Sequence, residues 1–377
     1  MARKRNRLRQ IAFSRLGIGV FFSLLCLLLP LEWYGLEGMT LVEKRILALF
    51  VMAALFWVLE PIPIYATSIL IIALELIMAS DAALLPFRRE EAAPLGDLLS
   101  YRKIMATFAS PIIILFLGGF FLAMAATKFR LDLNLARVLL RPFGTQPARV
   151  TMGLMGITAI FSMFMSNTAT TAMMLSILMP ILALLEEGDR GRIALTMSIP
   201  LAANIGGIGT PIGTPPNAIA LKYLTGAISF SQWMSFGLPF VIVLLFFGWW
   251  LLLRLYPFER DRIELDIKGR FQHNPKAYVV YGTFLTTILL WLTDFLHGMN
   301  AYVVAIIPVA VFLATNIITK EDLKKLSWDV LWLVAGGIAL GVGLEESGLA
   351  QRLVGAIPFD GFSPYLIIAL AAVLAMT

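Results

Sequence analysis

The sequence is dominated by apolar runs about as long as a helix that crosses a membrane. Such a helix needs about 20 apolar residues. Of the 377 residues, 59% are apolar and 14% are charged, whereas soluble domains have about 45–50% and about 25%. We therefore predict an all-α polytopic membrane protein and exclude a soluble enzyme. The predicted spans cover residues 17–34, 44–59, 62–79, 108–126, 235–256, 277–296, 301–318 and 329–346.

The formal net charge of +6 comes from the N-terminal tail. Basic side chains gather in cytoplasmic segments of membrane proteins, so we expect this tail inside the cell. The distribution argues against a nucleic-acid partner, which would need a basic folded face. We expect the first apolar run to be a retained span and not a cleaved signal peptide. Residues 1–31 hold no acid and six bases, namely Arg3, Lys4, Arg5, Arg7, Arg9 and Arg15.

Two later loops agree with a cytoplasmic N-terminus. Loop 127–149 carries five basic residues against Asp132, and loop 254–276 carries six against four acids. Both loops are predicted to be cytoplasmic. The apolar stretch between them at 150–185 is too long for one helix and is flanked by such loops at both ends. We predict a re-entrant helical hairpin there.

Polar or helix-breaking residues interrupt two apolar stretches. The predicted hairpin carries the polar run Ser166-Asn167-Thr168-Ala169-Thr170-Thr171. Residues 193–225 contain four glycines and three prolines within 204–217, which no continuous helix tolerates. Irregular backbone at membrane depth must be buried in protein or line a polar cavity. We therefore expect the two broken elements to face each other.

An internal repeat suggests the architecture. Residues 115–123, with Gly118-Gly119, resemble residues 333–341, with Gly336-Gly337, at an offset of 218. By the predicted topology the two copies run in opposite directions. Inverted repeats with broken helices are typical of secondary transporters, which bind their substrate near the membrane midplane. The alternative is a coincidence of paired glycines, because small residues are common where membrane helices touch.

The hairpin tip has the chemistry to hold two ions. One helix ends there and offers carbonyl oxygens to a cation, while the next begins there and offers N–H groups to an anion. Ser162, Ser166, Asn167 and carbonyls around Gly213 would form an all-oxygen sodium cage. Thr214, followed by Pro215, would meet the substrate. The alternative is that these residues only cap helices and turn the chain.

These motifs resemble those of the divalent-anion:sodium symporters, the sodium-coupled dicarboxylate, citrate and sulfate carriers. The resemblance rests on the runs 166–174 and 209–217 and on the repeated Leu-Gly-Gly pattern. It implies an elevator-type transporter in the inner membrane and a homodimer. It also implies sodium at Ser162, Ser166, Asn167 and Gly213, and the substrate carboxylate at Asn167, Thr168, Thr214 and Pro215.

One feature departs from that family. The family pattern has a second Ser-Asn-Thr tip, and this sequence has none. The apolar run 365–376 resembles the start of a second hairpin that is cut off, and Thr377 would then correspond to Ser162 as a ligand of a second sodium. We accordingly expect the second repeat to be incomplete and this chain by itself to be an inactive fragment.

The expected organisation follows the two repeats. A basic tail and a first span precede the scaffold, hairpin and broken helix of repeat 1, and repeat 2 follows. The boundaries are 1–16 for the tail, 17–34 for the first span, 35–126 for the first scaffold, 150–225 for the hairpin and broken helix, 235–256 for the last span of repeat 1, 277–346 for the second scaffold and 363–377 for the second hairpin.

The sequence is also compatible with other functions. A sulfate carrier of the same family fits, and so does a sodium/proton antiporter or an arsenite carrier, although those last two usually need an ionisable residue in the broken helices. An intramembrane enzyme would need a paired nucleophile and base, and we expect no metal other than sodium. Glu75 lies in an apolar run near a predicted span end. We interpret it as interfacial and not as a coupling carboxylate.

Overall fold

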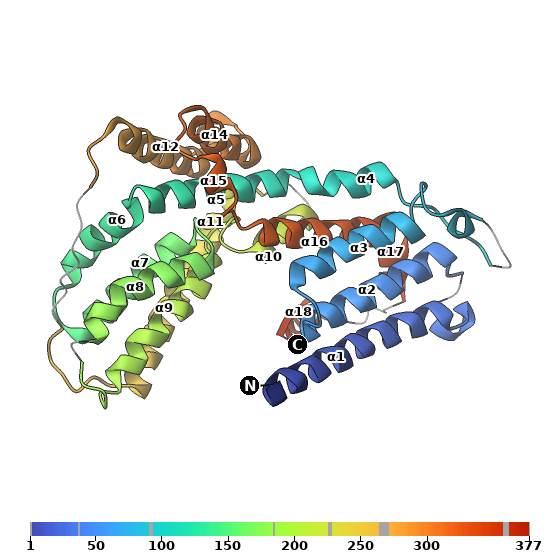
Figure 1. The fold of residues 1–377 in the computed structure, drawn as a ribbon, viewed down its shortest axis with the longest axis horizontal. Coiled ribbons are helices and arrows are strands. Elements are labelled where there is room, and N and C mark those ends of the chain that lie inside the picture. The colour runs from blue at the N-terminus through green and yellow to red at the C-terminus, as the bar shows by residue number, and fades with distance from the viewer. Residues whose placement is uncertain are drawn as a thin grey trace. The chain divides into compact units, whose positions relative to one another are not determined.

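A computed structural model describes the chain except for residues 1, 37, 90–92, 184, 225–227, 264–270, 357–361 and 377. The described residues are mostly helical (Figure 1), and their only strand-like pairing is an isolated bridge between Ser80 and Leu99. The prediction of an all-α protein is therefore confirmed.

The helices have the following bounds. The α-helices are α1 Ala2–Leu28, α2 Leu41–Leu59, α3 Ile64–Met78, α4 Tyr101–Ala106, α5 Pro111–Lys128, α6 Leu131–Leu140, α7 Pro147–Ser162, α8 Asn167–Leu182, α9 Gly191–Gly207, α10 Pro215–Tyr223, α11 Phe230–Leu255, α12 Pro275–Leu292, α13 Asp294–His297, α14 Ala301–Ala314, α15 Lys320–Leu323, α16 Trp328–Glu346, α17 Leu349–Gly355 and α18 Pro364–Met376. The 3₁₀ helices are η1 Leu31–Tyr34, η2 Leu85–Arg88, η3 Thr107–Ala109 and η4 Arg141–Phe143.

Each predicted span contains a helix. Within the described residues, three helices are long and apolar enough to cross a bilayer, and several others are apolar but shorter. The three are Tyr101–Lys128, Phe230–Leu255 and Trp328–Glu346. Helix α1 begins at Ala2, before the first predicted span, and ends at Leu28, within it. The basic tail is thus helical, and Pro30 stands just beyond the end of that helix.

The chain forms two compact units. One unit joins Met1–Ala109 with Trp332–Thr377, and the other is Ser110–Leu331. The second unit has its own apolar cores, one of which contains Phe312 of α14. In that core the rings of Phe230 and Trp291 stack 5.0 Å apart.

The hairpin and the broken helix both lie in the second unit. Helices α7, α8 and α9 pack side by side (Figure 1). The hairpin turns at Met163–Ser166, so Asn167 already belongs to α8. The second interruption covers Ile208–Thr214 between α9 and α10. Both predicted interruptions are confirmed, although the polar residues after Ser166 are helical.

The paired glycines lie at close helix contacts. In the second unit, a methyl group at Gly118 of α5 would overlap the main-chain oxygen of Ala305 in α14. In the first unit, a methyl group at Gly336 of α16 would overlap Ser68 of α3. Glycine permits both contacts because it has no side chain. The matching glycines of the sequence repeat therefore have matching packing roles.

The position of Glu75 shows that its interpretation as an interfacial residue was wrong. Its side chain is completely buried in the first unit, within 2.7 Å of the position that a methyl group on Gly343 would take. Neither carboxylate oxygen has a hydrogen-bond partner among the described residues. Glu43, which is also buried in this unit, instead accepts hydrogen bonds from Thr40 N and from Arg352 Nε, each at 2.7 Å.

Candidate functional site

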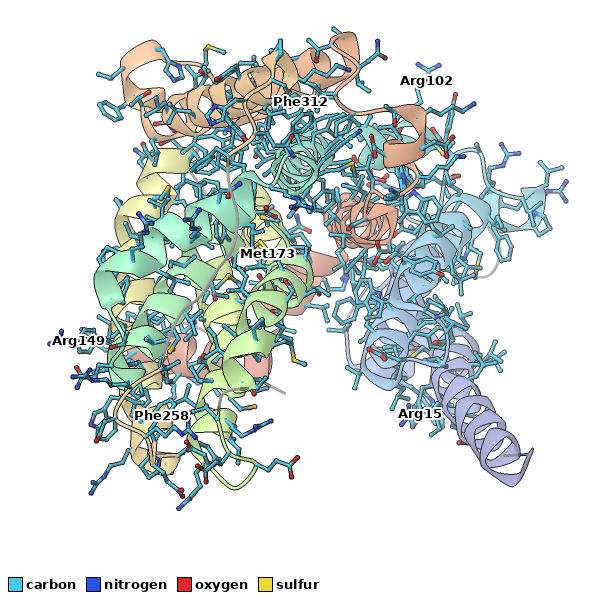
Figure 2. The ribbon with its side chains drawn as sticks, turned by 60° about the vertical axis from the view of Figure 1, so that its left-hand side comes forward. Arg15, Arg102, Arg149, Met173, Phe258 and Phe312 are labelled. Atoms are coloured by element: carbon cyan, nitrogen blue, oxygen red, sulfur yellow. The ribbon has the colours of Figure 1, made fainter. Side chains whose placement is uncertain are left out.

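Four helix ends meet in the second unit. In Figure 2 the labels on Arg149, in the first turn of α7, and on Met173, in α8, mark the two helices of the hairpin. The C-terminal ends of α7 and α9 approach the N-terminal ends of α8 and α10 through the side-chain contacts described below. Helix C-termini favour cations and helix N-termini favour anions. The arrangement can therefore hold ions of both signs close together.

Ser162 is the last residue of α7 and is fully buried. Its Oγ lies 2.7 Å from Asn167 Oδ1 and 2.7 Å from the carbonyl oxygen of Ala203. A hydroxyl group has a single proton to donate, so these two acceptors compete for it. The result is a group of three oxygens with more lone pairs than protons, which suits a hard cation.

Asn167 connects the hairpin tip to α9. Its Nδ2 donates to Asn204 Oδ1 at 3.2 Å, which leaves Oδ1 turned toward Ser162. Gly207 permits this approach, because a methyl group there would lie 2.8 Å from Asn167 Oδ1. The tip is therefore held against α9 by polar contacts.

The loop between α9 and α10 folds back onto the end of α9. A methyl group at Gly213 would overlap the carbonyl oxygen of Gly207. Asn217, in the first turns of α10, donates from Nδ2 to the carbonyl oxygens of Gly207 at 2.8 Å and Thr210 at 2.9 Å. Thr210 in turn donates its hydroxyl to the carbonyl of Met163 at the hairpin turn. These contacts fix both interruptions relative to each other.

The predicted site residues differ in their roles. Ser166 caps α8, where its Oγ accepts from Ala169 N at 3.2 Å. Ser162 ends α7 and Ser166 caps α8, so the two residues belong to different helices. Thr168 is exposed. Thr214 is the N-cap residue of α10 without a side-chain cap bond, and Pro215 is the first residue of that helix.

One predicted site residue, Thr377, lies outside the described residues. Sequence reasoning missed Ala203, Asn204 and Asn217 as members of the cluster. Two asparagines flanking a Gly/Pro-rich break were a usable signal, because an amide can cap the carbonyls that a broken helix leaves free.

Comparison with known proteins shows the family of the chain. A family model described as "Citrate transporter" matches residues 15–377. The chain belongs to the citrate transporter family. This confirms the resemblance to the divalent-anion:sodium symporters, and it makes the chain a member of a family of membrane transporters.

Individual proteins are also similar to this chain. The sodium-dependent dicarboxylate transporter SdcS of Staphylococcus aureus strain NCTC 8325 is 32% identical over 394 residues, which covers 93% of this chain and 72% of that protein. An uncharacterized transporter of Schizosaccharomyces pombe is 32% identical over 321 residues, covering 82% of this chain. This chain spans 36% of the length of that yeast protein.

Proposed function

We propose that this protein is a secondary active transporter that couples sodium to the symport of a divalent organic anion, a dicarboxylate such as succinate or malate. The observation that carries the proposal is the meeting of four helix ends around the oxygens of Ser162, Asn167 and Asn204. The name of the staphylococcal relative, a sodium-dependent dicarboxylate transporter, supports the same ion and substrate class.

Sodium would bind among the oxygens at the ends of α7 and α9. The ligands would be Ser162 Oγ, Asn167 Oδ1 and carbonyl oxygens near Gly213. Asn204 Oδ1 and oxygens of Ser166 would complete the cage. Sodium is a hard cation and takes oxygen ligands. No Asp, Glu, Lys, Arg or His belongs to this cluster as described above. The charge of a bound anion would therefore be balanced by co-transported sodium.

The substrate carboxylate would bind at the two helix N-termini. Free N–H groups at the start of α8 favour an anion, and the N-terminal end of the α10 dipole adds to that preference. Thr168 and Thr214 have hydroxyl groups that are available there, and Asn167 would contact both ions. Pro215 begins α10 without competing for an acceptor, because it has no N–H. Binding of sodium and binding of the anion are then coupled through Asn167.

The wider arrangement follows from the same proposal. The protein would lie in the cytoplasmic (inner) membrane with its N-terminus inside, as the basic tail and loops indicate. Its repeats would be inverted, and the hairpin and broken helix would move as an elevator in a homodimer, as the family resemblance implies. The matching packing of Gly118 and Gly336 supports the repeat.

Binding of labelled succinate to the purified protein tests the proposal. Binding should require sodium and disappear when choline replaces it. Asn167→Ala should weaken it at least about tenfold, equivalent to about 1.4 kcal/mol, because both ions lose a partner. The matched control is Ser176→Ala, which removes an exposed hydroxyl of α8 that bonds only to the local Met173 carbonyl at 2.6 Å. Equal binding in choline would refute the proposal.

A further inference from the structure

Two cavities of the second unit have the same volume but opposite charge. Each measures about 370 Å³, within the range of about 300–1,000 Å³ that is typical of small-molecule sites. One reaches the hairpin tip at Ser166 and Ala169, and we name it the tip cavity. The other reaches Pro211 in the break between α9 and α10.

The charged lining residues distinguish the two cavities. The tip cavity is lined by Lys128, Asp322 and Lys325, so that one positive charge is in excess. The second cavity is lined by Asp294 and by no lysine or arginine among the described residues. An incoming dianion is attracted to the first cavity and repelled from the second.

The ammonium group of Lys128 is already paired within the protein. Its Nζ donates to the carbonyl oxygen of Ile317 at 2.8 Å and to Asp322 Oδ2. Asp322 also accepts from the main-chain N and the hydroxyl of Thr319, at 2.9 and 2.8 Å. This pair is internally neutral, and it fixes the end of α5 to α15.

Lys325 supplies the remaining charge. Its side chain is exposed and has no acidic partner among the described residues, although it lines the tip cavity. Its neighbour Lys324 differs, since Lys324 Nζ pairs with Glu321 Oε2 at 2.7 Å and does not line the cavity. Lys325 is therefore free to bind an anion that enters.

We propose that the tip cavity is an anion-binding vestibule in which Lys325 captures the dianion before it reaches the start of α8. This inference rests on the proposed function and adds a binding residue outside the oxygen cluster. Ser166 and Ala169 line the same cavity, so an anion held by Lys325 is already in the space that leads to the first N–H groups of α8. Lys325 attracts doubly charged anions more strongly than singly charged ones.

Substitution of the adjacent lysines provides the test. Lys325→Gln and Lys324→Gln each remove one positive charge, at adjacent positions in the sequence. Only Lys325→Gln removes a charge from the lining of the tip cavity. At low ionic strength, Lys325→Gln should raise the dissociation constant for succinate about five- to tenfold, whereas Lys324→Gln leaves it nearly unchanged. Lys325→Arg, which keeps the charge, should retain binding. At about 0.3 M salt with the sodium concentration held constant, the difference should shrink because the charge is screened.

The binding measurements distinguish failure of the vestibule from failure of the proposed function. Equal dissociation constants for the Gln variants of Lys325 and Lys324 would overturn the vestibule while leaving the proposed function intact. The vestibule would also be refuted if monomethyl succinate, with one charge, lost as much affinity as succinate. If the unsubstituted protein bound no succinate in sodium, the proposed function itself would fail.

Discussion

Lys128 is the last residue of α5 and Glu346 is the last residue of α16, and each forms an ion pair. The helix-end residue is the base in the first pair and the acid in the second. Each stands ten residues after the first glycine of its pair, Gly118 in α5 and Gly336 in α16. Lys128 pairs with Asp322 in the segment that leads into α16. Glu346 pairs with Lys103 in the segment that leads into α5. The two glycine helices are thus fastened in the same manner with the charges exchanged, which an internal repeat readily explains.

Alanine at the paired glycines should destabilise the protein. Gly118→Ala and Gly336→Ala each force a methyl group into a neighbouring helix and should cost about 1–3 kcal/mol of unfolding free energy. Gly282→Ala in α12 is the matched control, because nothing lies within 4 Å of its new methyl group. The control should be neutral or gain up to about 1 kcal/mol from helix propensity. Thermal unfolding in detergent measures all three, and equal melting temperatures would contradict the close contacts.

Glu75 and Glu43, both buried in the first unit, should respond differently to substitution by glutamine. Glu75→Gln removes an unpaired carboxylate, so stability should be unchanged or higher. Glu43→Gln weakens a bond to Arg352 and the capping box at Thr40, and should cost about 1–3 kcal/mol. Denaturation of the two variants under identical conditions gives the comparison. A larger loss for Glu75→Gln would reveal a partner for that carboxylate.

Acid should remove the contribution of the Lys128–Asp322 pair. Partial burial favours the protonated acid, but hydrogen bonds from Lys128 and Thr319 outweigh it and lower the pKa of Asp322 from 3.8 to about 2. A lowered pKa in the folded state means that the pair stabilises the protein fully above pH 3.8 and loses its effect as the pH falls toward about 2. The difference in melting temperature between the unsubstituted protein and Asp322→Asn should therefore vanish over that interval. Glu321→Gln, at an exposed pair, is the control and should show little difference at any pH.

Thiol labelling should establish the orientation. In a Cys26→Ala background, Arg141→Cys lies in the predicted cytoplasmic loop 127–149. Arg89→Cys lies between the predicted spans 62–79 and 108–126, a segment that the same topology puts outside. Both positions are exposed, so accessibility depends on the side of the membrane. An impermeant reagent added to intact cells should label Arg89→Cys alone. Labelling of Arg141→Cys alone would reverse the topology.

The sequence predicted the helices better than the contacts between them. Apolar length and Gly/Pro interruptions are local properties, and they located the hairpin and the break between α9 and α10. The pairing of Ser162 with Ala203 depends on helices that are 41 residues apart at this contact, which no local pattern encodes. Glu75 was misplaced for a related reason, because nearness to a helix end does not reveal that α16 covers it.

The contact between α3 and α16 constrains how the protein is made. Ser68 and Glu75 face Gly336 and Gly343, which the ribosome adds roughly 270 residues later. At about 5–20 residues per second, α3 waits on the order of tens of seconds for its partner. During that interval the face of α3 that α16 later covers, with an ionisable side chain on it, is costly to expose to lipid. We therefore expect α3 to have a temporary neighbour during biogenesis, which translation arrest before residue 336 followed by crosslinking from position 75 would capture.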